Sequence, residues 1–137
     1  MTKSVSSQFT KVKNNALKNI SEVQRAVFFE MSNRIIQRTP VDTGRARANW
    51  QADVEGFKGG VVDAPASAGG GTSKAIQSVV ESLSKHRPGQ ALTLGNNLEY
   101  VPFLENGSSQ QAPQGMVALT VAEFKGIVEV QVRGIVK

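Results

Sequence analysis

The hydrophobic pattern of the first third of the chain predicts a long amphipathic helix over residues 7–38. Its apolar residues step by three or four positions and so share one stripe, formed by Phe9, Val12, Ala16, Ile20, Val23, Val27, Met31 and Ile35. The stripe is widened by Leu17, Phe28, Phe29 and Ile36. Two neighbours are therefore expected to pack near the C-terminal half of the helix, and any part of this widened flank that is left exposed is a candidate subunit contact. The helix should end near Thr39, because the residue before Pro40 avoids the α region.

Alternating patterns predict short strands further along. Residues 41–44 form a turn in which Gly44 takes a conformation that other residues resist, and Asp42 accepts backbone hydrogen bonds. Arg45 and Arg47 then lead into a strand over residues 48–57, in which Trp50 is a core or cross-strand residue, with an interface role as the alternative. Residues 90–96 form a second strand. Between the strands, residues 74–86 form a helix capped by Thr72 or Ser73.

Residues 56–73 are rich in glycine and predict a flexible loop. Six of the 13 glycines of the chain lie here, and Val61 and Val62 offer a short hairpin partner before the loop proper. The run Gly69-Gly70-Gly71-Thr72-Ser73-Lys74 lacks the glycine spacing of a phosphate-binding loop. We therefore expect no nucleotide site in this segment.

The last 24 residues, 114–137, fit two structures. Val117, Val121, Phe124, Val128 and Ile135 have helical spacing, and Pro113 lies just outside the start of such a helix. Val128, Val130 and Val132 also alternate with polar residues, as in a strand, and Gly126 and Gly134 weaken a helix. The residues alone leave helix and strand equally supported.

The segment of residues 98–116 has an unusual composition. It begins with the apolar residues Leu98, Tyr100, Val101, Phe103 and Leu104, interrupted by Pro102, and continues with neutral amides, glycine and proline. A solvated loop usually carries more charge and fewer large apolar groups. The composition therefore predicts a segment that lies against another protein.

Two blocks of sequence carry a family resemblance. TPVDTGRARANW, residues 39–50, and NNLEYVPFLENGSSQQAPQGMV, residues 96–117, resemble the two motifs of the neck, or tail-completion, proteins of long-tailed bacteriophages, in the same order. The resemblance covers essentially the whole chain and is weakest in the middle loop. In that family the Pro-x-Gly-Met sequence leads into a terminal helix, which favours a helix at the C-terminus. Ala46 and Ala48 depart from the bulkier apolar residues that are common there.

The resemblance implies a structural virion protein, assembled in the host cytoplasm, that completes the tail end and helps to join head and tail. Its expected partners are further copies in a ring, by analogy a hexamer, together with neighbouring connector and tail proteins. DNA would pass nearby without sequence-specific binding. The residues expected to form the interface or to shape its loops are Asp42, Gly44, Arg45, Trp50, Tyr100, Phe103, Leu104, Glu105, Gly107, Gln111, Pro113, Gly115 and Met116. A salt bridge between Arg45 and Glu105 would tie the two blocks together.

Composition limits the chemistry of the chain. Its 137 residues suit one domain, predicted as α+β with a small antiparallel sheet, and the absence of cysteine excludes disulfides and thiolate metal sites. We expect no secretory signal, no membrane span and a cytosolic product. The one histidine, His86, is expected to be solvated at a helix end. The carboxylates are scattered singly along the sequence. We therefore predict a protein with no enzymatic activity, cofactor, metal or small-molecule ligand.

The net charge of +5 is unevenly distributed. Residues 1–47 carry nine basic and three acidic side chains, whereas residues 48–137 carry seven basic and eight acidic ones. A solvated helix face explains this asymmetry, and a small basic nucleic-acid-binding domain is the alternative from another class. A tail terminator or another ring protein of the same virion is the closer alternative.

Overall fold

The structure is a computed structural model that describes residues 4–41, 44–57, 59–62 and 71–136. These residues form helices and one small sheet in an α+β arrangement, as predicted. The elements in chain order are α1 (Val5–Arg38), α2 (Arg45–Ala48), β1 (Gln51–Val54), α3 (Thr72–Lys85), β2 (Leu92–Gly95), α4 (Val101–Glu105), α5 (Val117–Ala122) and α6 (Phe124–Ile135). The predicted turn residue Asp42 and part of the flexible loop predicted over residues 56–73, namely residues 58 and 63–70, lie outside the described residues.

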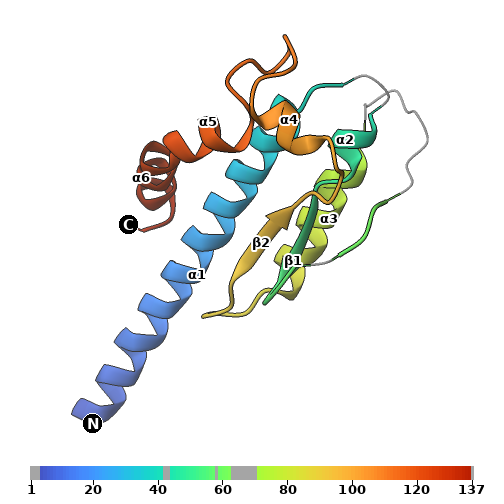
Figure 1. Cartoon of the computed structure of the whole chain (residues 1–137). Coiled ribbons are helices and arrows are strands. Elements are labelled where there is room, and N and C mark those ends of the chain that lie inside the picture. The colour runs from blue at the N-terminus through green and yellow to red at the C-terminus, as the bar shows by residue number, and fades with distance from the viewer. Residues whose placement is uncertain (1–3, 42–43, 58, 63–70, 137) are drawn as a thin grey trace.

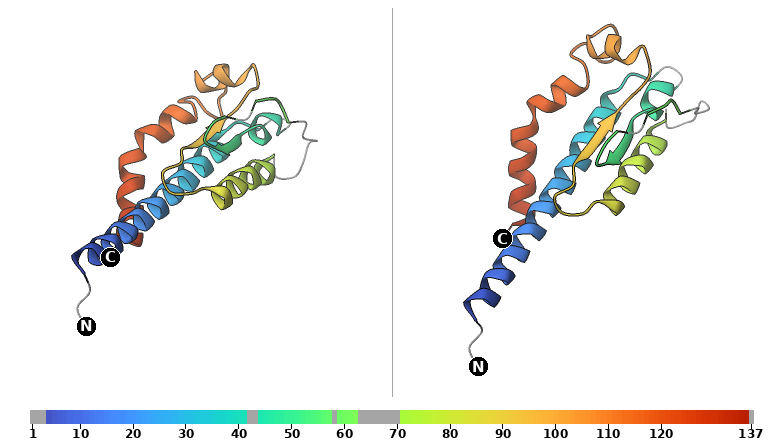
Figure 2. Two further views of the ribbon diagram at one scale, coloured as in Figure 1. Left: turned by 90° about the horizontal axis from the view of Figure 1, so that it is seen from below. Right: turned by 60° about the horizontal axis from the view of Figure 1, so that its bottom comes forward.

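The long helix α1 is the axis of the fold (Figure 1). It begins where the side chain of Ser4 accepts a hydrogen bond from the Ser7 N–H at 3.1 Å, and it ends at Arg38, before Pro40, as predicted. The sheet and α3 lie on one side of α1, and α6 lies on the other (Figures 1 and 2). The core therefore forms around the C-terminal half of α1.

Only that half of the predicted apolar stripe is buried. Val27, Ile35 and Ile36 are in the core, whereas residues 4–18 are all exposed. This N-terminal part of α1, residues 4–20, extends away from the domain and is called the arm below (Figures 1 and 2). The candidate subunit contact predicted from the sequence is a different part of the helix, the flank that widens the stripe. Of that flank, Leu17 and Phe29 are exposed and Ile36 is buried.

The sheet has two antiparallel strands, with Ala52 opposite Leu94 and Val54 opposite Leu92. Ala52 is part of the core and Leu94 packs against it, and β1 lies against α3. The predicted strand at residues 48–57 is too long: its first residue, with Arg45 and Arg47, belongs to α2. Gly44, at φ 88°, begins this short helix, and its carbonyl accepts a hydrogen bond from the Ala48 N–H. The helix propensity of the Arg-Ala-Arg-Ala sequence thus prevails over the weak alternation.

The start of α3 is determined by close packing against α2. The N-cap is Gly71 at φ 85°, with no hydrogen bond from a capping side chain, so the prediction that Thr72 or Ser73 caps this helix was wrong. A Cβ at Gly71 would lie 2.4 Å from the Gly44 carbonyl oxygen, so only glycine lets α3 approach α2 this closely. Val62 forms no hairpin strand; its N–H and carbonyl bond instead to the side chain of buried Asn49.

The C-terminal segment is helical, as the resemblance indicates, with a break at Glu123 between α5 and α6. Glu123 is held against α1 by a bidentate pair with Arg38, at 2.6 and 2.9 Å, and by Arg34 at 3.2 Å. Ile127 is buried against α1 one turn later. Gly126 and Gly134 lie within α6, and a Cβ at either position would meet open space, so no close contact requires glycine there.

We predict that the Glu123 contacts stabilise the protein in a pH-dependent way. The Arg38 hydrogen bonds, aided by Arg34, lower the pKa of Glu123 from 4.5 to about 2. The stabilisation is therefore complete above pH 4.5 and is lost as the pH falls to about 2. Urea denaturation of the wild type and Glu123→Gln should show a difference in unfolding free energy that shrinks over this range. Glu129→Gln, whose contact with Arg133 is long and exposed, is the control; an equal pH dependence for both variants would contradict the prediction.

Candidate protein–protein interface

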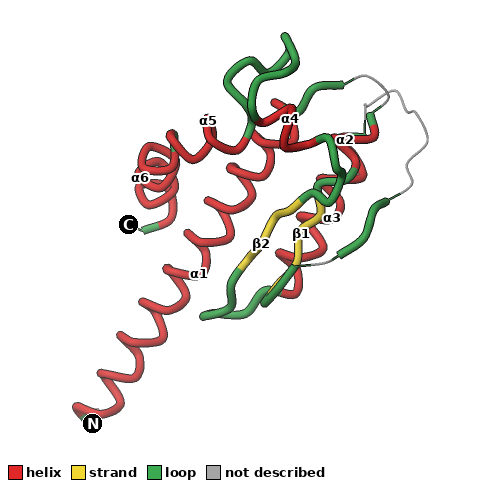
Figure 3. Tube along the Cα trace, viewed as in Figure 1, coloured by secondary structure: helices red, strands yellow, loops and turns green. Residues whose placement is uncertain are grey.

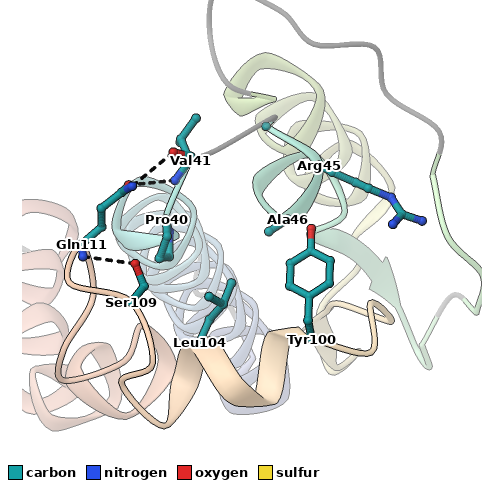
Figure 4. A pocket seen from close by; sticks show the side chains of 9 residues that line it. Pro40, Val41, Arg45, Ala46, Tyr100, Leu104, Ser109 and Gln111 are labelled. Atoms are coloured by element: carbon teal, nitrogen blue, oxygen red, sulfur yellow. Dashed lines mark hydrogen bonds between the residues drawn. The ribbon is translucent and has the colours of Figure 1, made fainter.

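The two motif blocks meet at one end of the molecule (Figures 1 and 3). Between them lies an open pocket of about 290 Å³. The first block lines it with Pro40, Val41, Gly44, Arg45 and Ala46, and the second with Tyr100, Leu104, Ser109 and Gln111. In Figure 4, Tyr100 extends from the second block towards α2, whereas Arg45 points outwards. We call this region, with the exposed side chains of residues 98–116, the motif junction.

Neutral hydrogen bonds tie the two blocks together. The Gln111 side chain accepts a hydrogen bond from the Val41 N–H at 2.9 Å and donates one to the Val41 carbonyl at 3.2 Å, across 70 residues of sequence (Figure 4). Asn96 donates another to the Ala46 carbonyl at 2.8 Å. Sequence reasoning did not select Asn96, although the Asn-Asn pair at the start of the second motif was the available signal.

Glu105 has a different partner from the predicted Arg45. Its carboxylate accepts hydrogen bonds from the backbone N–H groups of Met116, Val117 and Ala118, at 3.1, 2.9 and 2.8 Å. Burial raises the pKa of Glu105, but these three donors outweigh burial, so the pKa lies below its ordinary value. The carboxylate thus satisfies the first N–H groups of α5 and fixes the loop between α4 and α5.

Two glycines give that loop its shape. Gly107 and Gly115 both have positive φ, 87° and 80°. A Cβ at Gly107 would lie 2.4 Å from the Pro113 carbonyl oxygen, and one at Gly115 would lie 2.5 Å from that of Glu105. These two motif residues are therefore loop-shaping rather than contact-making.

Burial separates the other predicted interface residues into two groups. Met116 is fully buried and Trp50 is 4% exposed, with its indole N–H bonded to the Thr39 hydroxyl at 2.7 Å, so both serve the core. Phe103 is 65% exposed and Tyr100 is 38% exposed. Gln111 and Pro113 are also exposed, and Leu104, Glu105 and Gly107 are half-buried. The side chains that a partner could reach are therefore led by Phe103 and Tyr100.

Arg47 is half-buried and was not among the predicted interface or motif residues. Its guanidinium donates hydrogen bonds to the carbonyls of Gln37 and Thr39, at 3.0 and 2.9 Å, and to the Thr72 hydroxyl at 3.1 Å. Burial lowers the pKa of Arg47. Arg47 thus connects the end of α1, α2 and the start of α3 behind the motif junction.

His86 is buried, contrary to the prediction of a solvated side chain. Its Nε2 lies 2.9 Å from the Gln90 carbonyl and its Nδ1 lies 3.3 Å from Arg25 Nη1. Both contacts are hydrogen bonds when Nε2 carries the proton and donates it to the carbonyl. Among the described residues, no group of three or more histidine, cysteine or acidic side chains could hold a metal ion. No helix in the described ranges is long and apolar enough to cross a membrane.

Comparison with family models, curated proteins and solved structures finds no match for this chain. The resemblance to phage neck proteins is therefore a resemblance of the two motif blocks.

We predict that the positive φ of Gly115 is essential to the loop. Gly115→Ala should lower the unfolding free energy by about 2 kcal/mol or more, because a left-handed non-glycine residue costs about 1–2 kcal/mol and the new Cβ meets the Glu105 carbonyl. Gly126→Ala, in a helix with open space around it, should instead raise the unfolding free energy by about 0.5–1 kcal/mol. Urea denaturation measures the unfolding free energy of both variants. An unchanged unfolding free energy for Gly115→Ala would show that the loop does not need this conformation.

Proposed function

We propose that this chain is a structural protein of the neck of a long-tailed bacteriophage, where it completes the tail end and helps to join tail and head. The observation that carries the proposal is the motif junction. The two blocks that resemble the family motifs lie far apart in sequence, yet Gln111 bonds directly to Val41 between them. Residues shared with a family are expected to converge in this way when they build one functional surface.

The motif junction has the composition of a protein-binding surface. Phe103 and Tyr100 supply exposed aromatic area, and the residues around them, such as Gln111 and Pro113, are neutral. Aromatic residues are enriched at interface cores, where charged residues are depleted. Binding here forms an interface and requires no reaction, which suits an assembly component.

Other exposed apolar side chains support a chain with several neighbours. Val121, Phe124 and Val130 of the C-terminal helices are each about half exposed or more. Extensive exposed apolar surface on a small domain marks sites of association. In the proposed ring, a head-to-tail contact repeated around a closed circle uses two different surfaces of each copy. The sixfold symmetry is taken from the resemblance.

We predict that Phe103→Asp weakens ring assembly while leaving the fold intact. Phe103 is mostly exposed, so its replacement should shift the thermal midpoint little, whereas an uncompensated carboxylate at the interface should weaken association at least tenfold, or about 1.4 kcal/mol. Light scattering across a dilution series measures the mass of the assembly. Val80→Asp, at a half-exposed position on α3, is the matched control. Equal masses for Phe103→Asp and the wild type would show that the motif junction takes no part in ring assembly.

The place of the chain in the virion separates the proposal from its alternatives. A tail terminator would cap purified tail tubes alone, whereas a neck protein should bind the tail end together with the head connector. The alternative of a nucleic-acid-binding domain is supported by the arm, because Lys11, Lys13 and Lys18 lie there with no acidic residue between positions 4 and 21. DNA binding that weakens steeply with salt, without self-association, would favour that alternative.

A further inference from the structure

The motif junction contains an asparagine whose side chain the next residue can attack. Asn106 is followed by Gly107, and it is the only asparagine of the chain that precedes a glycine. The backbone nitrogen after an asparagine can attack the side-chain carboxamide and close a five-membered cyclic imide. A glycine obstructs this nitrogen least, because it has no Cβ. Asn106 is also exposed, so water reaches its side chain, and the dipeptide is a candidate site of deamidation.

The reaction consists of two balanced steps. In the first, the Gly107 nitrogen forms a bond to Cγ of Asn106, the bond from Cγ to Nδ2 breaks, and ammonia leaves with the proton that the Gly107 nitrogen gives up. In the second, one water molecule opens the imide at either of its two carbonyl carbons. Opening at Cγ leaves aspartate, whereas opening at the backbone carbon leaves isoaspartate, in which the main chain runs through Cγ. Neither step consumes an oxidant or a reductant.

The folded turn opposes the first step. Asn106 is the C-cap of α4, and the residues after it form the two hydrogen bonds of a Schellman motif, with Gly107 at φ 87°. The Gly107 N–H donates to the Leu104 carbonyl at 3.0 Å, and the Ser108 N–H donates to the Phe103 carbonyl at 3.1 Å. The nitrogen that must lose its proton is therefore already engaged as a hydrogen-bond donor to another residue.

The backbone angle of Asn106 is also unsuitable for ring closure. In the cyclic imide, Cβ of the asparagine and the nitrogen of the next residue lie nearly in one plane with the two carbon atoms between them. The observed ψ of 6° instead brings the Gly107 nitrogen close to the plane of the Asn106 nitrogen, and the tetrahedral geometry of Cα then keeps Cβ well out of that plane. Closure therefore requires a large rotation about the Cα–C bond, which breaks the hydrogen bond from Gly107 to Leu104.

The rest of the loop resists this rotation. Gly107 packs so closely on Pro113 that a Cβ there would lie 2.4 Å from the Pro113 carbonyl oxygen, and Gly115 packs in the same way on the Glu105 carbonyl. The Glu105 carboxylate holds the other end of the loop through the N–H groups at the start of α5. The turn is therefore free to rotate when these contacts open.

We propose that Asn106 is a modification site that the closed motif junction protects, and that a copy whose loop opens is converted there to aspartate or isoaspartate. Either product adds a carboxylate to the neutral surface near Phe103. Isoaspartate also lengthens the main chain by one carbon, so the Schellman hydrogen bonds cannot re-form in the same way. The proposal is independent of the proposed function, because the reaction requires the turn and water alone.

Peptide mapping by mass spectrometry tests the proposal on the full chain, because replacing the side-chain NH₂ by OH changes the mass of the peptide that contains residue 106. The native wild type should react at least about tenfold more slowly than the same chain unfolded in urea, because the fraction of molecules with an open loop limits the native rate. Gly115→Ala and Glu105→Gln, which disturb the loop, should each raise the native rate relative to the rate of the same variant in urea.

Val79→Ala is the control, because it deletes buried methyl groups on α3 and lowers the stability of the whole domain rather than of the loop. Its native rate, relative to its rate in urea, should stay close to that of the wild type. Circular dichroism checks that each variant is folded, and if Gly115→Ala does not fold, Glu105→Gln decides.

Four outcomes would overturn the proposal. The first is equal rates for the native and the unfolded wild type, and the second is no modification of Asn106 in urea. The third is that the folded loop variants react no faster than the wild type. The fourth is an acceleration by Val79→Ala as large as that by the loop variants, because unfolding of the whole domain would then expose the site.

Discussion

The buried hydroxyl of Thr39 holds the end of the long helix to the rest of the fold. It donates to the Ile35 carbonyl and accepts the indole N–H of Trp50, both at 2.7 Å. The backbone carbonyl of Thr39 accepts a further hydrogen bond from Arg47. A buried group that loses such a partner costs about 1–3 kcal/mol, so these contacts act together. They position α1 and the strand that follows Trp50, and through Pro40 and Val41 they place one wall of the motif junction.

This arrangement accounts for the first motif as a structural unit. Within a dozen residues the chain ends a helix, turns and enters a strand, and this path depends on Thr39, Gly44 and Trp50. Arg47 packs behind these residues and bonds to the Thr39 carbonyl. The second motif is held in a similar way by Glu105 and its glycines. Most of the motif residues therefore hold the backbone of the motif junction in place, and a few, led by Phe103, are exposed on its surface.

The sequence predicted those parts of the structure that depend on local patterns. The end of α1 follows from Pro40 alone, and the positive φ of Gly44 follows from its place in a turn. The predictions from the sequence were wrong where contacts with residues distant in the sequence determine the structure. Gly71 starts α3 because α2 packs against it, His86 is buried because Arg25 and Gln90 lie beside it, and Glu105 reaches backbone donors that no spacing rule connects to it. The helical pattern of α1 was read correctly, but periodicity could not show that its N-terminal half extends beyond the domain.

The Glu105 carboxylate has a consequence for recognition. Because it already holds the start of α5, and Gln111 already holds Val41, the segment between them has its shape before any partner arrives. A flexible segment would lose conformational entropy on binding, which lowers affinity. Here that cost is met during folding, so a protein that binds this segment would meet a surface whose backbone is already ordered.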